Sequence, residues 1–135
     1  MAYDLLASVS YAEENALGQS IGRCARYVKK ALAAGGIELQ CVHAQNCSAG
    51  LEAQGFEAVM NQNTDTGSYE KGDVVVIEGG ADPDGDGPKK GNPSGHMAIW
   101  NGEIWLSDFK QSKAVYPGPG YRANKPPYKI YRAKK

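Results

Sequence analysis

The clearest periodic pattern in the chain runs from Ser20 to Leu32, where apolar residues recur at steps of three and four. That spacing is the period of one face of an α-helix. Ser20 can cap the start of this helix, and Gly35-Gly36 can end it because glycine adopts positive φ readily. We therefore predict a helix whose first turn holds Cys24 and whose apolar face is formed by Ile21, Cys24, Ala25, Val28, Ala31 and Leu32.

Two weaker helical patterns lie on either side of this one. A helix is expected around Ala44 to Gln54, where Gly55 ends it, and another within Tyr3 to Leu17. Strand-forming sequence begins at Gly72, because the four consecutive branched aliphatic residues of DVVVIEGG predict a buried strand. All three predicted helices therefore precede the predicted sheet.

Further strand patterns complete the chain. The stretch HMAIWNGEIWLSDF contains the Asn-Gly signal of a β-hairpin, YKIYR predicts a last strand, and ADPDGDGPKKGNPSG predicts a surface loop. Helices followed by antiparallel strands form the α+β pattern. Because 135 residues suit one core, we expect a single domain over residues 1–135, with N-terminal helices packed on an antiparallel β-sheet.

Composition and charge narrow the class of protein. The chain is 41% hydrophobic and 22% charged, which is typical of a globular protein, and its 15 basic and 15 acidic residues cancel. This balance disfavours a nucleic-acid or membrane-surface partner bound through bulk charge. Neither an apolar run of about 20 residues nor a Sec-type leader is visible. We therefore expect synthesis in the cytoplasm, no membrane insertion and no nucleic-acid partner.

The charge is unevenly distributed, because no acidic residue follows Asp108. Four of the eight tyrosines are interleaved with lysine and arginine in this basic tail. Such a tail can stack on bases or on sugar faces. The simplest interpretation is a solvated edge strand that lysines protect from pairing with other chains.

Cys24 is the first candidate for chemistry. A thiol at the start of a helix lies at the positive end of the backbone dipole, and Arg23 and Arg26 add positive charge beside it. Both effects favour the reactive thiolate. The alternative is that Cys24 fills the core as a small apolar residue. Its partners decide between these interpretations.

His96 opens the strand HMAIW and is a better candidate base than His43, the only other histidine. Asp108 follows twelve positions later, and the hairpin register decides whether it reaches His96. A three-residue loop at Trp100–Gly102 places His96 opposite Leu106 and on the same face as Asp108. A two-residue Asn-Gly turn places Asp108 on the other face.

Cys24, His96 and Asp108 together make a nucleophile triad. The thiolate attacks a carbonyl carbon, the imidazole protonates the leaving amine, and the carboxylate orients the imidazole. The reaction is acyl transfer, most simply amide hydrolysis. The backbone N–H of Cys24 can stabilise the oxyanion, and Tyr11 or Gln19 is a candidate second donor.

A possible calcium loop opens at Asp82, Asp84, Asp86 and Gly87. The twelfth position of that loop is Pro93, where calcium requires a bidentate glutamate. We therefore expect no metal and no cofactor.

Four segments, taken in order, resemble the NlpC-type and CHAP families of small cysteine peptidases and amidases: SIGRCARYVKKALAAGGI, Gly55-Phe56, YEKGDVVVIEGG and GHMAIWNGEIWLSDF. The resemblance spans about Ser20 to Lys110. It implies a circularly rearranged papain-like fold and cleavage of peptidoglycan, with Cys24 as nucleophile, His96 as base and Asp108 as the residue that orients the base. Members often have Asn, Gln, Glu or a second His in that third place.

The resemblance leaves the cleaved bond open. The chain reads Gly22-Arg23-Cys24-Ala25 where NlpC-type enzymes often have Asp-Cys-Ser-Gly. A compact catalytic domain also resembles amidase effectors that type VI secretion injects into the periplasm of rival bacteria, and phage lysins share these traits. The effector resemblance implies action on the wall and a cognate immunity protein. An oxidising destination would let Cys41 and Cys47 form a disulfide, and otherwise both are thiols.

Two other classes of protein fit the same residues. One is a non-catalytic wall-binding or protein-binding module in which Cys24 is packed. The other is an intracellular cysteine peptidase or deamidase that acts on protein amides. Both differ from a wall hydrolase in thiol reactivity or in the compartment of action.

Overall fold

The computed structural model describes residues 4–16, 24–39, 41, 47–77, 96–107, 110–111, 115–116 and 127–133, with the backbone alone at 24 and 25. Within these residues, three helices precede five strands: α1 Leu5–Asn15, α2 Cys24–Ala34, α3 Cys47–Ala53, β1 Phe56–Asn61, β2 Val74–Ile77, β3 His96–Trp100, β4 Trp105–Leu106 and β5 Tyr128–Ala133. The strands form one antiparallel sheet in the order β1-β5-β2-β3-β4. The α+β prediction is confirmed, and the arrangement is consistent with a papain-like fold.

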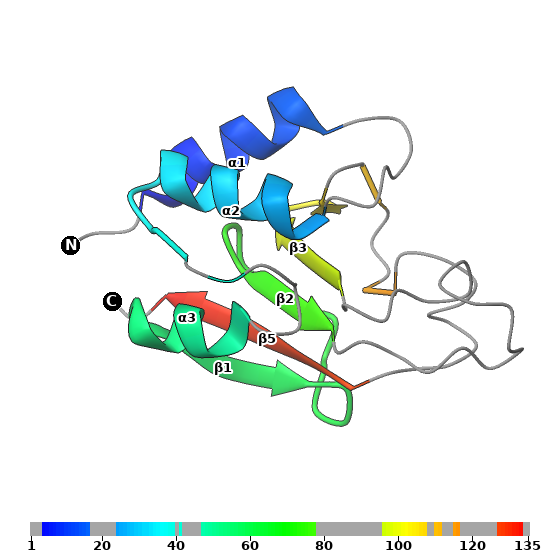
Figure 1. The fold of residues 1–135 in the computed structure, drawn as a ribbon. Helices are drawn as coiled ribbons and strands as arrows, with labels where there is room; N and C mark the ends of the chain where they lie inside the picture. Colours follow the sequence, from blue (N-terminus) through cyan, green and yellow to red (C-terminus); the bar gives the residue numbers. More distant parts are fainter. Residues whose placement is uncertain are drawn as a thin grey trace, which may run out of the picture.

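The helices lie on one face of the sheet (Figure 1). α1 and α2 pack on each other and on β3, while α3 packs on β1. α2 and β3 both begin on the same side of the molecule, on the right in Figure 1. No helix in the described part of the chain is long and apolar enough to cross a membrane. The core between helices and sheet includes Val9, Ala12, Val28, Ala31, Leu32, Leu51, Val74, Val76, Met97 and Ile99.

α2 has the buried face that its sequence predicts. Val28, Ala31 and Leu32 are all buried, whereas Ile21 and the predicted cap Ser20 lie outside the described residues. The helix ends at the predicted glycines: the Gly35 N–H donates to the Leu32 carbonyl at 2.9 Å, and Gly36 has φ +91°. A left-handed glycine is a common way to end a helix, because it satisfies carbonyls of the last turn.

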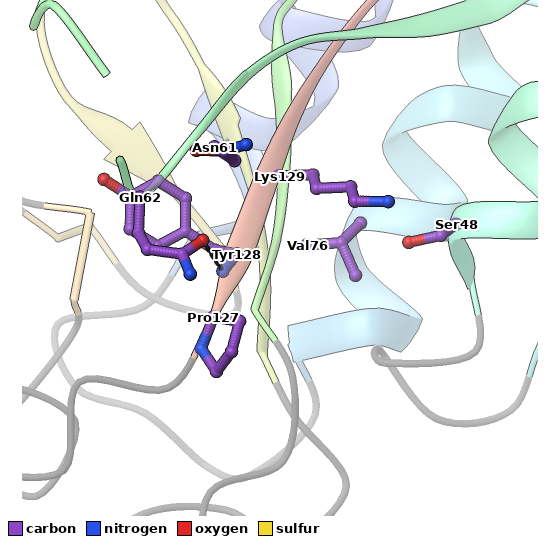
Figure 2. A pocket seen from close by; sticks show the side chains of 7 residues that line it. All are labelled: Ser48, Asn61, Gln62, Val76, Pro127, Tyr128 and Lys129. Carbon is purple, nitrogen blue, oxygen red and sulfur yellow. Dashed lines mark hydrogen bonds between the residues drawn. The ribbon is translucent and has the colours of Figure 1, made fainter. Parts of the chain in front are cut away.

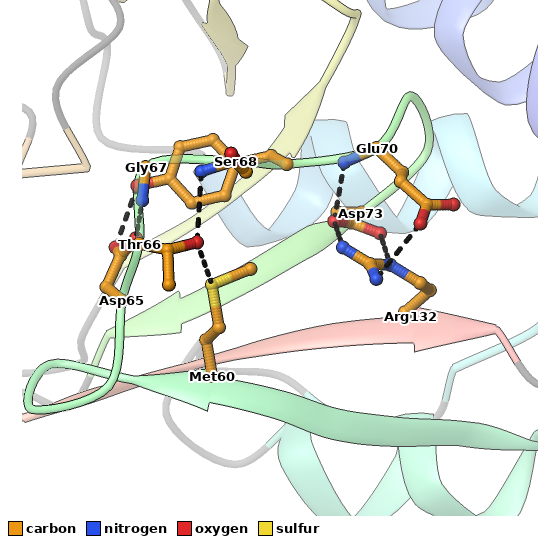
Figure 3. Close-up of polar contacts among 9 residues, drawn as sticks. Met60, Asp65, Thr66, Gly67, Ser68, Glu70, Asp73 and Arg132 are labelled. Carbon is orange, nitrogen blue, oxygen red and sulfur yellow. Dashed lines mark hydrogen bonds and ion pairs between the residues drawn. The ribbon is translucent and has the colours of Figure 1, made fainter.

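The Gly72-Asp73 pair before β2 has a structural role. Gly72 has φ +95°, and a Cβ built there would lie 2.8 Å from the Cβ of Leu5 in α1, so a side chain does not fit. Asp73 is 1% exposed. Arg132 of β5 donates to both of its carboxylate oxygens, Nε to Oδ1 at 3.0 Å and Nη2 to Oδ2 at 2.8 Å (Figure 3). This bidentate pair joins the turn to β5.

Two expectations about the sheet are wrong. The sheet begins at Phe56 rather than at Gly72, because β1 pairs with β5. β1 alternates poorly between buried and exposed positions and has a register shift between Ala58 and Met60, so its sequence lacks a strand pattern. The strand of the basic tail, β5, is not an edge strand, since it lies between β1 and β2.

The hairpin loop between β3 and β4 has neither of the two lengths considered above. Trp100 pairs with Trp105, so four residues, Asn101–Ile104, connect the strands. The Asn101 Oδ1 accepts from the N–H groups of Glu103 and Ile104, each at 2.8 Å, and this side-chain turn replaces a tighter backbone turn. In this register Ile99 opposes Leu106, so His96 and Leu106 lie on opposite faces of the sheet.

The face of the sheet away from the helices carries a tyrosine–aspartate cluster, formed by Asp65, Tyr69, Trp100, Trp105 and Tyr128. The Tyr69 ring lies 5.0 Å from the Trp100 ring and 4.9 Å from the Trp105 ring, between centroids. The Tyr69 and Tyr128 hydroxyls both donate to Asp65 Oδ2 at 2.7 Å. Burial, and then the hydrogen bond to Asp65, raise the pKa of both tyrosines.

Candidate active site

His96 is the first residue of β3 and is 5% exposed. It pairs with Ile77 across the sheet, at the end of β2. Its Nε2 donates to the side-chain oxygen of Gln111 at 2.6 Å. Because an amide oxygen only accepts, this contact uses Nε2 of the ring as the N–H donor.

Gln111 is a candidate site residue that the sequence did not single out. After β4 the chain forms a bridge between Leu106 and Lys110, and the Gln111 N–H donates to the Trp105 carbonyl at 2.9 Å. This bridge places Gln111 against His96. The side-chain Nε2 of Gln111 is buried and has no hydrogen-bond partner in the described part of the chain. The one available signal was that related families often have glutamine in the third place.

Asp108 was the sequence-based candidate for the third place, and it lies outside the described residues. Of the two registers considered for it, the structure has neither. The predicted contact of Asp108 with His96, diagonally on one face, stays a prediction, while Gln111 is the residue that the structure brings to the imidazole.

Cys24 is the first described residue of α2, and its side chain lies outside the described part of the structure. The first N–H groups of a helix have no partners within the helix, and the dipole is positive there. α2 packs on β3, and both elements begin on the same side of the molecule (Figure 1). The start of the helix that bears Cys24 and the start of the strand that bears His96 thus belong to the same end of the fold.

Of the two candidate oxyanion donors, Tyr11 lies within the described residues and Gln19 does not. Tyr11 lies in α1, half-buried against the core between helices and sheet, and its backbone carbonyl accepts from the Asn15 side chain at 2.8 Å. The role of Tyr11 as an oxyanion donor stays a prediction.

A disulfide joins Cys41 and Cys47, whose Cα atoms are 5.2 Å apart. The disulfide links the start of α3 to the segment after α2. Lys29 of α2 donates a hydrogen bond to the Cys41 carbonyl, which ties that segment to α2 as well. The chain has three cysteines, and Cys24 is the one outside the bond.

Among the described residues no three His, Cys, Asp or Glu side chains gather as a metal site. The calcium-like residues Asp82, Asp84 and Asp86 lie outside those residues, as does His43.

Comparison with known proteins gives a clear relationship at the level of structure. No protein-family profile and no curated protein matches the chain. The chain is similar to a solved structure of the type VI native effector–immunity complex Tae3-Tai3 from Ralstonia pickettii, with 43% identity and a TM-score of 0.82 over 98% of this chain and 100% of that chain. The selenomethionine form of the complex matches with 43% identity and a TM-score of 0.78, over 93% of this chain and 99% of that one.

The similarity covers both the helices and the sheet, because the matched chain is covered over its whole length. A sequence identity of 43% over that length goes well beyond a shared fold class. This chain therefore belongs to the Tae3 family of type VI effectors.

Proposed function

We propose that this protein is a peptidoglycan amidase, a single catalytic domain that type VI secretion delivers to the wall of a rival bacterium. Cys24 is the nucleophile, His96 is the base, and Gln111 orients the base. The observation that carries the proposal is the His96–Gln111 hydrogen bond at the start of β3, in a chain of the Tae3 effector family. The resemblance of the cysteine helix and the Gly-His strand to NlpC-type and CHAP enzymes supports the same assignment.

The proposed reaction is acyl transfer in two steps. His96 Nδ1 accepts the thiol proton, and the thiolate of Cys24 attacks the carbonyl carbon of a stem-peptide amide. As the tetrahedral intermediate collapses, the C–N bond breaks and His96 gives its proton to the leaving amine. Water, deprotonated by His96, then hydrolyses the thioester and releases the carboxylic acid and the thiol.

Two features of the fold support this chemistry. The N–H of Cys24, in the first turn of the helix that the sequence predicts, is the proposed donor to the oxyanion, because the first N–H groups of a helix have no partner within it. Gln111 fixes the imidazole through a neutral amide, which orients the ring without sharing its charge. Gln111 is a positioning residue, and Asp108 stays a sequence-based alternative for that role.

The relatives also suggest a partner. Both matched structures are effector–immunity complexes. We propose that a cognate immunity protein binds this chain and blocks its wall activity, and that the effector works in the periplasm or wall after injection. A phage-type lysin is disfavoured, because the relatives named here are type VI effectors.

The proposal is tested with purified peptidoglycan sacculi. Wild-type protein should release soluble muropeptides, and Cys24→Ala should lower the rate more than about 1,000-fold with an unchanged circular dichroism spectrum. Lys30→Gln, an exposed change on the same helix, is the matched control and should keep the wild-type rate. If Cys24→Ala keeps its activity, Cys24 is not the nucleophile and other residues carry out the reaction.

Two further measurements separate the alternatives. A nucleophilic Cys24 should react quickly with iodoacetamide below about pH 8, whereas a packed thiol in a binding module should not. Expression in the periplasm should be toxic and expression in the cytoplasm should not, whereas a deamidase of cytoplasmic proteins predicts the reverse. Mass spectrometry of the released muropeptides identifies the bond that is cut.

A further inference from the structure

A polar pocket of about 450 Å³ lies on the helix face of the sheet, where β1 ends and β5 begins. We call it the lysine pocket, because Lys129 is its one charged residue. Figure 2 shows the Lys129 amine and the Ser48 hydroxyl directed toward each other, and Tyr128 leaving β5 on the other side. Its lining residues are Ser48, Asn61, Gln62, Val76, Pro127, Tyr128 and Lys129.

The register of the sheet relates this pocket to the proposed active site. Met97 pairs with Val76, Val76 pairs with Lys129, and Lys129 pairs with Asn61, so these residues form one row across the sheet. His96 stands in the adjacent row, so its side chain leaves the opposite face of the sheet from Val76 and Lys129. The pocket and the imidazole therefore lie at the same end of the sheet, on its two faces.

The two side-chain amides of the pocket offer hydrogen-bond donors, because their oxygens already have partners. Asn61 Oδ1 accepts from the Asn63 N–H at 2.8 Å and the Thr64 N–H at 3.2 Å. Gln62 Oε1 accepts from the Tyr128 N–H at 3.2 Å. The NH₂ groups of both amides remain as donors.

Lys129 adds a positive charge to these donors. None of the described carboxylates pairs with it, since the ion pairs given for the described residues involve Arg132. The Tyr128 hydroxyl is directed away to Asp65 and does not compete. A cationic amine with two amide NH₂ groups and a hydroxyl is a donor set that suits a carboxylate.

We infer that the lysine pocket binds a carboxylate of the stem peptide. This inference rests on the proposed function and adds a determinant of substrate choice. Lys129 provides the charge, while Asn61 and Gln62 provide directed N–H groups. When that carboxylate is amidated, Lys129 loses its oppositely charged partner. The new NH₂ group of the peptide then faces the hydrogen-bond donors of the pocket.

Binding tests the inference independently of turnover. The inactive Cys24→Ala protein is titrated calorimetrically with two purified muropeptides, one with free stem-peptide carboxylates and one with these amidated. The free acid should bind at least about tenfold more tightly, as expected for a hydrogen-bonded charge pair. Lys129→Gln should abolish that preference, and Lys129→Arg and the control Lys30→Gln should retain it.

A second variant sharpens the result without removing the lysine. Asn61→Asp keeps an oxygen for the Asn63 and Thr64 N–H groups and adds a negative charge to the pocket, so it should weaken binding of the acid and leave the amide unaffected. Equal affinity of the two muropeptides for the Cys24→Ala protein, or a preference that survives Lys129→Gln, overturns the inference. Failure of wild-type protein to cut either muropeptide overturns the proposed function instead.

Discussion

The tyrosine–aspartate cluster and the lysine pocket lie on opposite faces of one sheet, and they differ in whether their polar groups already have hydrogen-bond partners. In the cluster, Asp65 Oδ2 accepts from two tyrosine hydroxyls, and Oδ1 accepts from the Gly67 N–H at 2.8 Å. In the pocket, Lys129 and the amide NH₂ groups have no carboxylate beside them among the described residues. Tyr128 belongs to both, since it is one of the residues that line the pocket and its hydroxyl binds Asp65.

This difference separates groups that stabilise the protein from groups that remain available to a ligand. A carboxylate whose two oxygens are both paired, as in Asp65, stabilises one conformation, because breaking a pair leaves a carboxylate oxygen or a tyrosine hydroxyl unsatisfied. Donors that stay unpaired beside a cavity contribute nothing to folding. Variants of the first kind should therefore change stability and leave substrate affinity unaffected, and variants of the second kind should do the reverse.

The largest effect is expected at His96. His96→Ala should lower kcat on sacculi more than about 1,000-fold, because the proposed reaction loses the base that activates the thiol. Gln111→Ala should lower it less, about 10-fold to 100-fold, since it removes orientation and not the base. Asp108→Ala, measured beside it, decides the third place: a larger loss than in Gln111→Ala assigns that role to Asp108.

The next effect concerns stability alone. Arg132→Met should lower the free energy of unfolding by about 3 kcal/mol, because Asp73 is 1% exposed and is left without its bidentate partner. Glu70→Gln is the control. The Glu70 side chain is 61% exposed, so losing its ion pair with Arg132 should cost less than about 1 kcal/mol. Urea unfolding measures both, and equal losses would contradict the distinction.

A smaller loss of stability is expected from the disulfide. Cys41→Ser with Cys47→Ser should lower the free energy of unfolding by about 2 kcal/mol, because the bond closes a short loop with a sequence separation of 6. Reducing agent should destabilise wild-type protein by a similar amount and leave the double variant unchanged. Because Ser48 of the lysine pocket follows Cys47, muropeptide affinity should be measured in the same samples.

Removing one hydroxyl from the tyrosine–aspartate cluster should have a modest effect. Tyr69→Phe and Tyr128→Phe should each lower the free energy of unfolding by about 1 kcal/mol, since Asp65 keeps one of its two hydroxyl donors. Their combined loss should exceed the sum of the single losses, because the double variant leaves the carboxylate oxygen without either hydroxyl. An unchanged rate on sacculi is expected, and a large loss of activity would place the cluster in the site.

The smallest expected effect is the loss of stability at high pH that accompanies ionisation of Tyr69 and Tyr128. The pKa of Tyr69 and of Tyr128 is raised, by burial first and by Asp65 second. A folded-state pKa above the unfolded value gives stability that is complete below the unfolded pKa, about 10, and is lost as the pH rises through the folded pKa. At about pH 11 the folded protein should show the same tyrosinate absorbance as the Tyr69→Phe/Tyr128→Phe variant.

Features that follow from local sequence were predictable. The apolar period of α2, its end at Gly35-Gly36 and the burial of β2 depend on residues close together in the chain. The structure agrees with all three, and it places His96 at the start of a strand and Cys24 at the start of a helix as predicted. The α+β class follows from the order of these elements.

What the sequence determined by itself is thus the identity and order of the main elements and the candidate thiol and imidazole that they carry. The tertiary structure decided the pairing of β1 with β5, the four-residue hairpin loop, the contact of Gln111 with His96 and the row that links Lys129 to His96's neighbour. The physical reason is that periodicity and glycine conformations act over a few residues, whereas strand register and side-chain partners depend on segments far apart in the chain.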